Sequence, residues 1–129
     1  MSTEQEVRDA ADALVSDFGA GRVEEYFARL APEATFVFHT APARLGSRAA
    51  YRELWGRWVA EDGFRVMSCR STGQVVQVLA ADVAVLTHDV ATTIATHAGQ
   101  EELRERESVV FARVGGVWLV VHEHLSAAG

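Results

Sequence analysis

The sequence predicts an α+β protein in which helices come first and a curved antiparallel sheet follows. In the first half of the chain, three segments carry apolar residues at helical spacing, with one short strand among them. From Phe64 onward, four long stretches rich in β-branched residues are separated by short turn sequences. This segregation predicts that one face of an antiparallel meander packs against the helices. The 129 residues are enough for a single domain, residues 1–129, with its own core.

The first two helices are bounded by sequence signals. Residues 3–6 fit a capping box, and apolar residues recur at helical spacing from there to Phe18. We therefore expect the first helix to stop at the glycine-containing residues 19–21. A second, short helix is expected over residues 23–30, and Pro32 is expected to end it because proline cannot continue a helix.

A short strand and a third helix follow. Residues 34–39 are β-branched and aromatic, which predicts a strand. Pro42 and Gly46 break the next segment, and Ser47 is expected to cap the third helix. The apolar stripe of that helix consists of Ala50, Tyr51, Leu54, Trp55, Trp58 and Val59.

The second half of the chain is expected to form a meander of four long strands. Turn sequences separate the strands, and Gly115-Gly116 predicts a tight hairpin between the last two. The strands are expected at residues 64–79, 83–96, 101–114 and 117–126.

The last strand, residues 118–126, is the most informative. Successive side chains on a strand point to opposite faces, so strict alternation puts His122 and His124 on the face of Trp118 and puts Glu123 on the other. Either the histidines converge on one point, or Glu123 stands alone on an aliphatic face. Ionisable groups are costly to bury, so one of the two faces is expected to line a functional site.

The composition excludes several classes of function. All twelve basic residues are arginine and the net charge is −6, so Schiff-base chemistry and nucleic-acid binding are not expected. Cys69 is the only cysteine, and we expect a buried structural thiol. The polar, acidic N-terminal residues and the lack of long apolar runs predict a cytoplasmic protein without membrane contact.

The order of elements, together with Gly46 before the third helix and the closing pattern W-x-x-x-H-x-H-x-S, resembles the nuclear transport factor 2-like superfamily. This superfamily includes the ketosteroid isomerases, the SnoaL-like polyketide cyclases and scytalone dehydratase. The closing pattern is most similar to the SnoaL-like branch and to the association domain of calcium/calmodulin-dependent kinase II. The resemblance covers the whole chain. It implies a cone-shaped sheet that encloses a pocket at its wide end, and a homodimer formed through the outer face of the sheet.

The catalytic residues of the ketosteroid isomerases do not carry over to this chain. The carboxylate base at the end of the first strand is replaced by residues 36–39, with His39 beside its position. The position of the tyrosine falls near Leu14, and that of the aspartate falls at Ser108 or Val109. Ketosteroid isomerisation by the known machinery is therefore not expected.

Glu123 is the first catalytic candidate. Leu119, Val121 and Leu125 share its face under strict alternation, which favours the inner side of the sheet. Burial there would raise its pKa and suit it to acid–base chemistry near neutrality. Alternatively, this face is the outer, dimer-forming one, and Glu123 pairs with an arginine such as Arg113.

Histidines supply the other catalytic candidates. His88 lies on an apolar-leaning strand face and His39 lies beside the position of the isomerase base, so each is a candidate base or a satisfied structural histidine. His122 and His124 have the spacing of a metal-binding pair, but no acidic residue follows in the five residues that remain. Structural roles are favoured for this pair, and neither a metal nor another cofactor is expected.

Four further residues are expected to contact a ligand. Glu107 shares a strand face with Phe111 and could share a proton with Glu123, although the alternating charges around it also fit a solvated strand end. Tyr51 and Trp55 lie on the inner stripe of the third helix, beside the expected mouth of the cone. Packing explains both, and the Tyr51 hydroxyl adds a hydrogen-bonding group.

These features predict a protein that binds a small, partly apolar molecule and forms a homodimer. If it is an enzyme, we expect a cofactor-free isomerase, cyclase or dehydratase acting beside a carbonyl, with Glu123 or His88 as base and Tyr51 as hydrogen-bond donor. The composition, free of lysine and rich in arginine and alanine, is typical of a high-GC bacterium. By analogy with the SnoaL-like polyketide cyclases, this composition suggests a role in bacterial secondary metabolism. The alternative is a non-catalytic binding or oligomerisation module.

Overall fold

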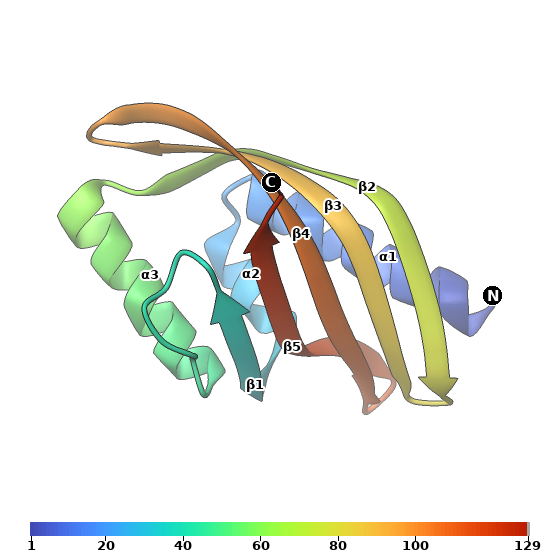
Figure 1. The fold of residues 1–129 in the computed structure, drawn as a ribbon. Coiled ribbons are helices and arrows are strands. Elements are labelled where there is room, and N and C mark those ends of the chain that lie inside the picture. The colour runs from blue at the N-terminus through green and yellow to red at the C-terminus, as the bar shows by residue number, and fades with distance from the viewer. Residues whose placement is uncertain (129) are drawn as a thin grey trace.

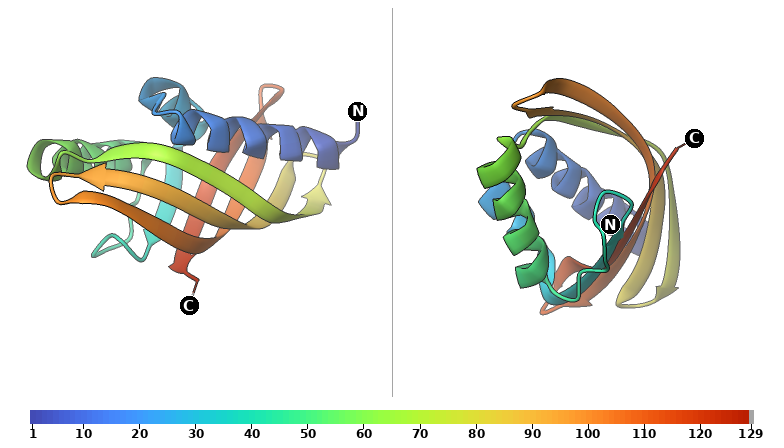
Figure 2. Two further views of the ribbon diagram at one scale, coloured as in Figure 1. Left: turned by 90° about the horizontal axis from the view of Figure 1, so that it is seen from above. Right: turned by 60° about the vertical axis from the view of Figure 1, so that its left-hand side comes forward.

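The computed structural model describes residues 1–128 and confirms the α+β cone (Figure 1). Three helices lie on the concave side of one strongly curved five-stranded sheet (Figure 2). Within the described residues, no helix is long and apolar enough to cross a membrane. The elements are α1 (Thr3–Gly19), α2 (Val23–Ala28), β1 (Leu30–Phe38), α3 (Arg48–Asp62), β2 (Arg65–Ala80), β3 (Val83–Thr96), β4 (Gly99–Val114) and β5 (Val117–Ala127).

The sheet has the strand order β1-β5-β4-β3-β2. The four long strands β2 to β5 form the predicted antiparallel meander. The first strand differs from the wholly antiparallel arrangement, because β1 joins the edge of the sheet parallel to β5. These two strands come from opposite ends of the chain, so no short hairpin constrains their relative direction.

Two helix boundaries differ by a few residues from those predicted. The N-cap of α1 is Ser2, whose hydroxyl accepts a hydrogen bond from Gln5 N at 3.1 Å, rather than a residue of the predicted capping box. The second helix ends at Ala28, and Pro32 lies inside β1 instead of ending the helix. An edge strand tolerates proline where its missing N–H would otherwise face solvent.

An irregularity in β5 changes which of its side chains face the concave side. Phe111 on β4 pairs with Val120, whereas Val110 pairs with His122, so Val121 is an extra residue that forms a β-bulge. The bulge resets the alternation of side chains. As a result, Val120 and Glu123 are both buried on the same side of the sheet, 0% and 3% exposed.

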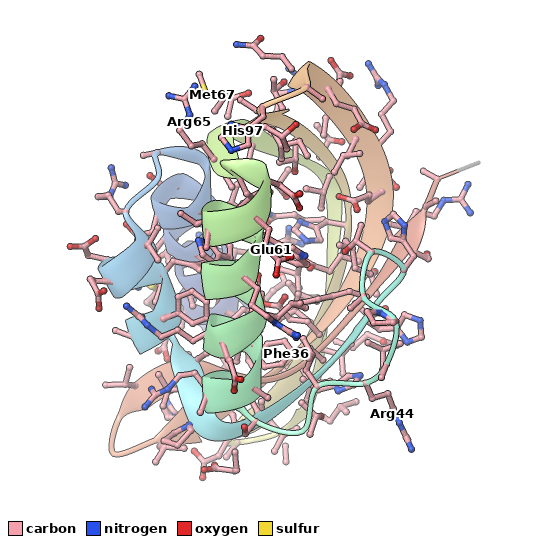
Figure 3. All side chains as sticks on the ribbon, turned by 90° about the vertical axis from the view of Figure 1, so that its left-hand side faces the viewer. Phe36, Arg44, Glu61, Arg65, Met67 and His97 are labelled. Atoms are coloured by element: carbon pink, nitrogen blue, oxygen red, sulfur yellow. The ribbon has the colours of Figure 1, made fainter. Side chains whose placement is uncertain are left out.

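The core fills the narrow part of the cone, between the helices and the concave face. Figure 3 shows Phe36 in the space behind α3, whereas Arg44 on the preceding loop points outward. His97 lies against the end of α3, where its backbone N–H donates to the Asp62 carbonyl at 2.8 Å (Figure 3). The largest fully buried side chains are Phe36, Phe111, Leu30, Leu86, Val7, Val109 and Val120.

Two helical glycines provide a matched test of this packing. A Cβ on Gly19 would lie 2.8 Å from the backbone nitrogen of Cys69, because the end of α1 packs directly on β2. A Cβ on Gly56, in the middle of α3, would meet nothing within 4 Å. We expect Gly19→Ala to lower the free energy of unfolding by about 1–3 kcal/mol. Gly56→Ala should raise it by about 0.5–1 kcal/mol. Urea unfolding measures both, and equal effects of the two substitutions would contradict the close α1–β2 contact.

Candidate active site

A cavity of about 250 Å³ lies between the three helices and the wide end of the sheet. Exposed Thr40 and Asp62 are among its lining residues and mark where it opens to solvent. Its walls are mainly aromatic and aliphatic, and its polar groups come mostly from the sheet. This combination is typical of a small-molecule site. The apolar lining residues are Leu14, Val15, Phe18, Tyr26, Phe38, Tyr51, Trp55, Trp58, Phe64, Val90, Ile94, Leu103 and Leu125.

The helical wall carries a pair of buried tyrosines. The hydroxyl oxygens of Tyr26 on α2 and Tyr51 on α3 are 2.9 Å apart and hydrogen-bond to each other. Burial, followed by the negative charge of nearby Glu123, raises the pKa of both tyrosines well above the usual value, so both stay protonated. Both residues line the cavity, as does Trp55. The sequence pattern placed Tyr26 only in a helical stripe, and the spacing between the two tyrosines gave no signal of their contact.

The sheet side of the cavity carries two carboxyl groups that interact directly, Glu107 on β4 and Glu123 on β5. Burial and the charge of Glu105 raise the pKa of Glu107 to about 8, although its hydrogen bond with Glu123 acts in the opposite direction. Burial raises the pKa of Glu123 well above its usual value, and the charge and hydrogen bond of Glu107 add to the effect. Two carboxyls this close cannot both ionise at low cost, so they titrate as one coupled pair that holds a proton at neutral pH.

His88 on β3 contacts one member of this pair, Glu107. Its Nε2 lies 2.8 Å from Glu107 Oε1 and its Nδ1 lies 2.6 Å from Ser71 Oγ on β2. Burial lowers the pKa of His88, which is only partly offset by the charges of Glu123, Asp89 and Asp12, so the ring is neutral at neutral pH. His88 also lines the cavity, but its side chain is only 1% exposed and both of its ring nitrogens already have partners within the protein.

A second histidine–glutamate contact lies near the mouth. Glu105, 4% exposed, lines the cavity and is 2.5 Å from Nε2 of His39. The His39 side chain is 32% exposed and is not among the cavity-lining residues. His39 therefore contacts Glu105 from outside and does not itself reach the cavity.

Two expectations about neighbouring residues differ from the structure. Phe111, expected to contact a ligand, is 1% exposed and belongs to the core; it does not line the cavity. Arg113, considered as a partner for Glu123, instead donates to Asp82 at 3.0 Å and to Glu6 at 3.2 Å. The bulge at Val121 explains the second difference, because it turns Glu123 toward the cavity. Phe111 pairs with Val120 on the other side of this bulge.

His122 and His124 do not enter the cavity lining. His122 Nδ1 lies 2.8 Å from Thr35 Oγ1 on β1, and His124 is exposed. Within residues 1–128, no group of three or more His, Cys, Asp or Glu side chains is arranged to hold a metal ion.

Cys69 lies in the cavity wall, where Thr92 Oγ1 is 3.5 Å from its sulfur. Burial, reduced slightly by the Thr92 hydrogen bond, raises the pKa of the thiol to about 11. A thiol that stays protonated at neutral pH is a poor nucleophile, so Cys69 contributes shape and not covalent chemistry.

The SnoaL-like domain pattern matches residues 7–129, almost the whole sequence. The chain belongs to the SnoaL-like family. No curated protein matches the sequence of this SnoaL-like chain. The family assignment agrees with the resemblance predicted from the closing strand and the order of elements.

Solved structures confirm the nuclear transport factor 2-like fold of this SnoaL-like protein. A calcium/calmodulin-dependent protein kinase II association domain from Xanthomonas campestris aligns with a TM-score of 0.82 at 18% identity, covering 99% of this chain and 89% of that chain. An NTF2-like protein of unknown function in nutrient uptake from Rhodospirillum rubrum aligns with 0.81 at 17% identity, covering 95% and 98%. An NTF2-like superfamily protein from Salmonella enterica aligns with 0.80 at 18% identity, covering 98% and 91%. At these identities the likeness concerns the fold alone.

Proposed function

We propose that the cavity is the active site of a cofactor-free acid–base enzyme, an isomerase, cyclase or dehydratase, that acts on a small, partly apolar carbonyl compound. The observation that carries this proposal is the coupled Glu107–Glu123 pair at one point of an otherwise apolar cavity. Carboxyl groups with strongly shifted pKa values that lie together in a cleft are typical of catalytic sites. By analogy with the SnoaL-like polyketide cyclases, the compound belongs to bacterial secondary metabolism.

The two carboxyls divide the work between them. With one proton in the pair, the Glu107 carboxylate accepts a proton from the carbon beside the carbonyl, and protonated Glu123 donates a hydrogen bond to the carbonyl oxygen. His88 stabilises the ionised state of Glu107 by donating from Nε2. Returning the proton from Glu107 to a different carbon completes an isomerisation. In a dehydration, Glu107 instead gives that proton to a hydroxyl group on the next carbon, which leaves as water while the enolate collapses to a double bond.

The tyrosine pair supports the oxygen of the substrate. In the Tyr26–Tyr51 pair, one hydroxyl donates to the other, which leaves one O–H free to donate elsewhere. Both tyrosines line the same cavity as Glu123, whose charge affects them more than any other charge does. An enolate oxygen formed there would receive hydrogen bonds from Glu123 and from a tyrosine.

The charge of the cavity favours neutral ligands over anions. Asp62, Glu105, Glu107 and Glu123 line it, and no arginine is among the described lining residues. An anion would lose its hydration without gaining a cationic partner. We therefore expect 2-naphthol to bind at least about tenfold more tightly than 2-naphthoate, a ligand of similar shape with a negative charge.

Deuterium exchange tests the proposed chemistry directly. The probe is 2-tetralone, a neutral bicyclic ketone with acidic hydrogens beside its carbonyl, in deuterated buffer followed by NMR. The wild-type protein should accelerate exchange of these hydrogens above the buffer rate. Glu107→Gln, which removes the proposed base, should reduce the acceleration by roughly 100-fold or more, the usual contribution of one acid–base group. The matched control is Glu101→Gln, which alters an exposed carboxyl on the same sheet.

The same experiment separates catalysis from binding alone. If 2-tetralone binds but its exchange stays at the buffer rate, the acid–base proposal is wrong and the cavity belongs to a non-catalytic binding module. If exchange is accelerated equally by wild type and Glu107→Gln, the carboxyl pair is not the reactive centre.

We also propose that the protein is a homodimer formed through the convex face of the sheet. All three helices lie on the other side, so this face is uncovered in the single chain (Figure 2). Half-buried Val85 and Val110 are cross-strand neighbours there, beside the bulge residue Val121. Sedimentation equilibrium should give a dimer, and Val110→Asp should shift the mass to a monomer. A monomeric wild type would overturn the proposal.

A further inference from the structure

A chain of hydrogen bonds leads from the carboxyl pair out of the cavity. Glu107 Oε1 is 2.8 Å from His88 Nε2, and His88 Nδ1 is 2.6 Å from Ser71 Oγ. Gln74 Nε2 then donates to Ser71 Oγ at 3.0 Å and to Asp12 Oδ1 at 2.9 Å. These contacts join β4, β3, β2 and α1 in one continuous network.

The far end of this network lies away from the mouth of the cavity. Ser71 is half-buried where α1 packs on β2, and it is not a cavity-lining residue. Gln74 is half-buried and Asp12 on α1 is exposed to solvent. Figure 2 shows α1 running along β2, so the network ends beneath α1. A ligand that fills the mouth at Thr40 would therefore leave the Ser71 end open to water.

The donors and acceptors in this chain allow two arrangements only. When Glu107 is protonated, its O–H donates to Nε2 and His88 Nδ1–H donates to Ser71 Oγ. When Glu107 is ionised, His88 Nε2–H donates to the carboxylate and the Ser71 hydroxyl donates to Nδ1. In both arrangements Gln74 donates to Ser71, so its amide, held by Asp12, fixes the position of the hydroxyl.

We propose that His88 and Ser71 form a proton relay that lets Glu107 exchange its proton with water beneath α1 while the cavity is occupied. This inference rests on the proposed function, because the relay would return the carboxyl pair to its starting protonation state between turnovers. In one passage, the Glu107 proton moves to Nε2, the Nδ1 proton moves to Ser71 Oγ, and the original hydroxyl proton of Ser71 moves to water. His88 changes tautomer and carries no net charge afterwards, Glu107 becomes a carboxylate, and water gains one proton.

Burial keeps His88 in the neutral state that the relay needs, against the effect of the surrounding negative charges. The carboxyls that affect it are Glu123 on β5, Asp89 on its own strand and Asp12 on α1, besides its partner Glu107 on β4, whereas β2 contributes the neutral Ser71 hydroxyl. At the outer end, Arg8 on α1 donates to the backbone carbonyl of Gln74 at 3.3 Å. Burial outweighs the charges and keeps the pKa of His88 below its usual value, so the ring passes protons by changing tautomer.

Nitrogen NMR of His88 in the full chain tests the relay without any substrate. In the wild type, the proton should move from Nδ1 to Nε2 as Glu107 ionises, with a midpoint near pH 8. Ser71→Ala removes the partner of Nδ1 in both arrangements. A buried N–H donor without a partner costs more than a buried acceptor without one, so the loss favours the Nε2–H tautomer and ionised Glu107. The midpoint should fall by about one pH unit or more. Ser71→Thr keeps a hydroxyl at this position and should therefore keep the wild-type midpoint.

Two further variants complete the design. Ser68→Ala changes an exposed serine on the same strand and should leave the midpoint unchanged. Gln74→Ala frees the Ser71 hydroxyl from its fixed position and should give a smaller shift in the direction of Ser71→Ala. An unchanged tautomer and midpoint in Ser71→Ala would overturn the relay.

Kinetics then separate the relay from the proposed function. In 2-tetralone exchange, Ser71→Ala should lower kcat at least about threefold with KM unchanged, because the relay resets the carboxyl pair and does not hold the ligand. If the NMR coupling is present and the wild type lacks exchange activity, the proposed function fails while the hydrogen-bonded coupling stands. If exchange is active and Ser71→Ala leaves both kcat and the tautomer unchanged, the relay alone fails.

Discussion

Between about pH 6.5 and 8 the wild-type protein should lose stability steadily, and Glu107→Gln should remove the part of this loss that Glu107 causes. Burial raises the pKa of Glu107 from 4.5 to about 8 in the folded protein, so the folded state keeps a proton that the unfolded chain has released. Each such proton costs about 1.4 kcal/mol of unfolding free energy per pH unit. The side-chain amide of the Glu107→Gln variant is neutral at every pH and retains hydrogen-bonding groups for His88.

The sign of this effect follows from the direction of the pKa shift. A carboxyl with a raised pKa contributes its stabilisation fully below its unfolded pKa of about 4.5 and loses it as the pH rises through the folded pKa. Glu123 adds to the loss, because its pKa is raised as well. His88 acts in the opposite direction below about pH 6.5, since burial lowers its pKa. The window above pH 6.5 therefore isolates the carboxyl pair.

Urea unfolding at several pH values measures the effect, with Glu101→Gln as the control for loss of an exposed carboxyl. The control should keep the slope of the wild type. A wild-type stability that is constant across this window would show that the buried carboxyls are already ionised, and it would remove the basis for the shared proton.

Phe111→Ala should lower the free energy of unfolding by about 3–5 kcal/mol, the usual cost of emptying a large aromatic site in a core. Phe111 is 1% exposed and lies between Ala84 on β3 and Val120 on β5, both fully buried. These neighbours sit on paired strands, which leaves them little freedom to collapse into the space.

Phe111→Leu is the matched variant, because it keeps most of the buried volume and should cost less than about 1.5 kcal/mol. It should also leave the affinity for 2-naphthol unchanged, since Phe111 is not a cavity-lining residue. Tyr51→Phe should show the reverse pattern, with a small loss of stability and weaker ligand binding. If Phe111→Leu weakened 2-naphthol binding and left the free energy of unfolding unchanged, Phe111 would be a ligand-contacting residue and not a core residue.

Much of the fold could be predicted because its signals are local. Ser47 caps α3 as expected, accepting a hydrogen bond from Ala50 N at 3.0 Å, and the glycines at the β4–β5 turn form the predicted hairpin. The segregation of helices from long strands in the sequence was enough to predict the layers. The boundary between α2 and β1 could not be predicted from Pro32, because a proline can either end a helix or occupy an edge strand.

The candidate site was predicted only in part. The expectation that Glu123 faces inward relied on strict alternation, which put Trp118 on the opposite face. In the structure both are buried, 9% and 3% exposed for Trp118 and Glu123, because Val121 adds a residue to β5 between them. A bulge depends on how two strands pair, so the sequence of β5 alone did not reveal it.

The sequence by itself determined the kinds of groups available: carboxyls and histidines on strands, aromatic stripes on helices, and no lysine. It also determined the layers, because local hydrophobic periodicity fixes which elements form. Only the tertiary structure decided which groups meet. Glu107 reaches Glu123 and His88, His88 reaches Ser71, and Tyr26 reaches Tyr51. These contacts depend on strand register, on one bulge and on helix packing. Burial inside the resulting cavity then raises the pKa of Glu123 and of its partner Glu107, and a raised pKa suits both carboxyls to acid–base chemistry.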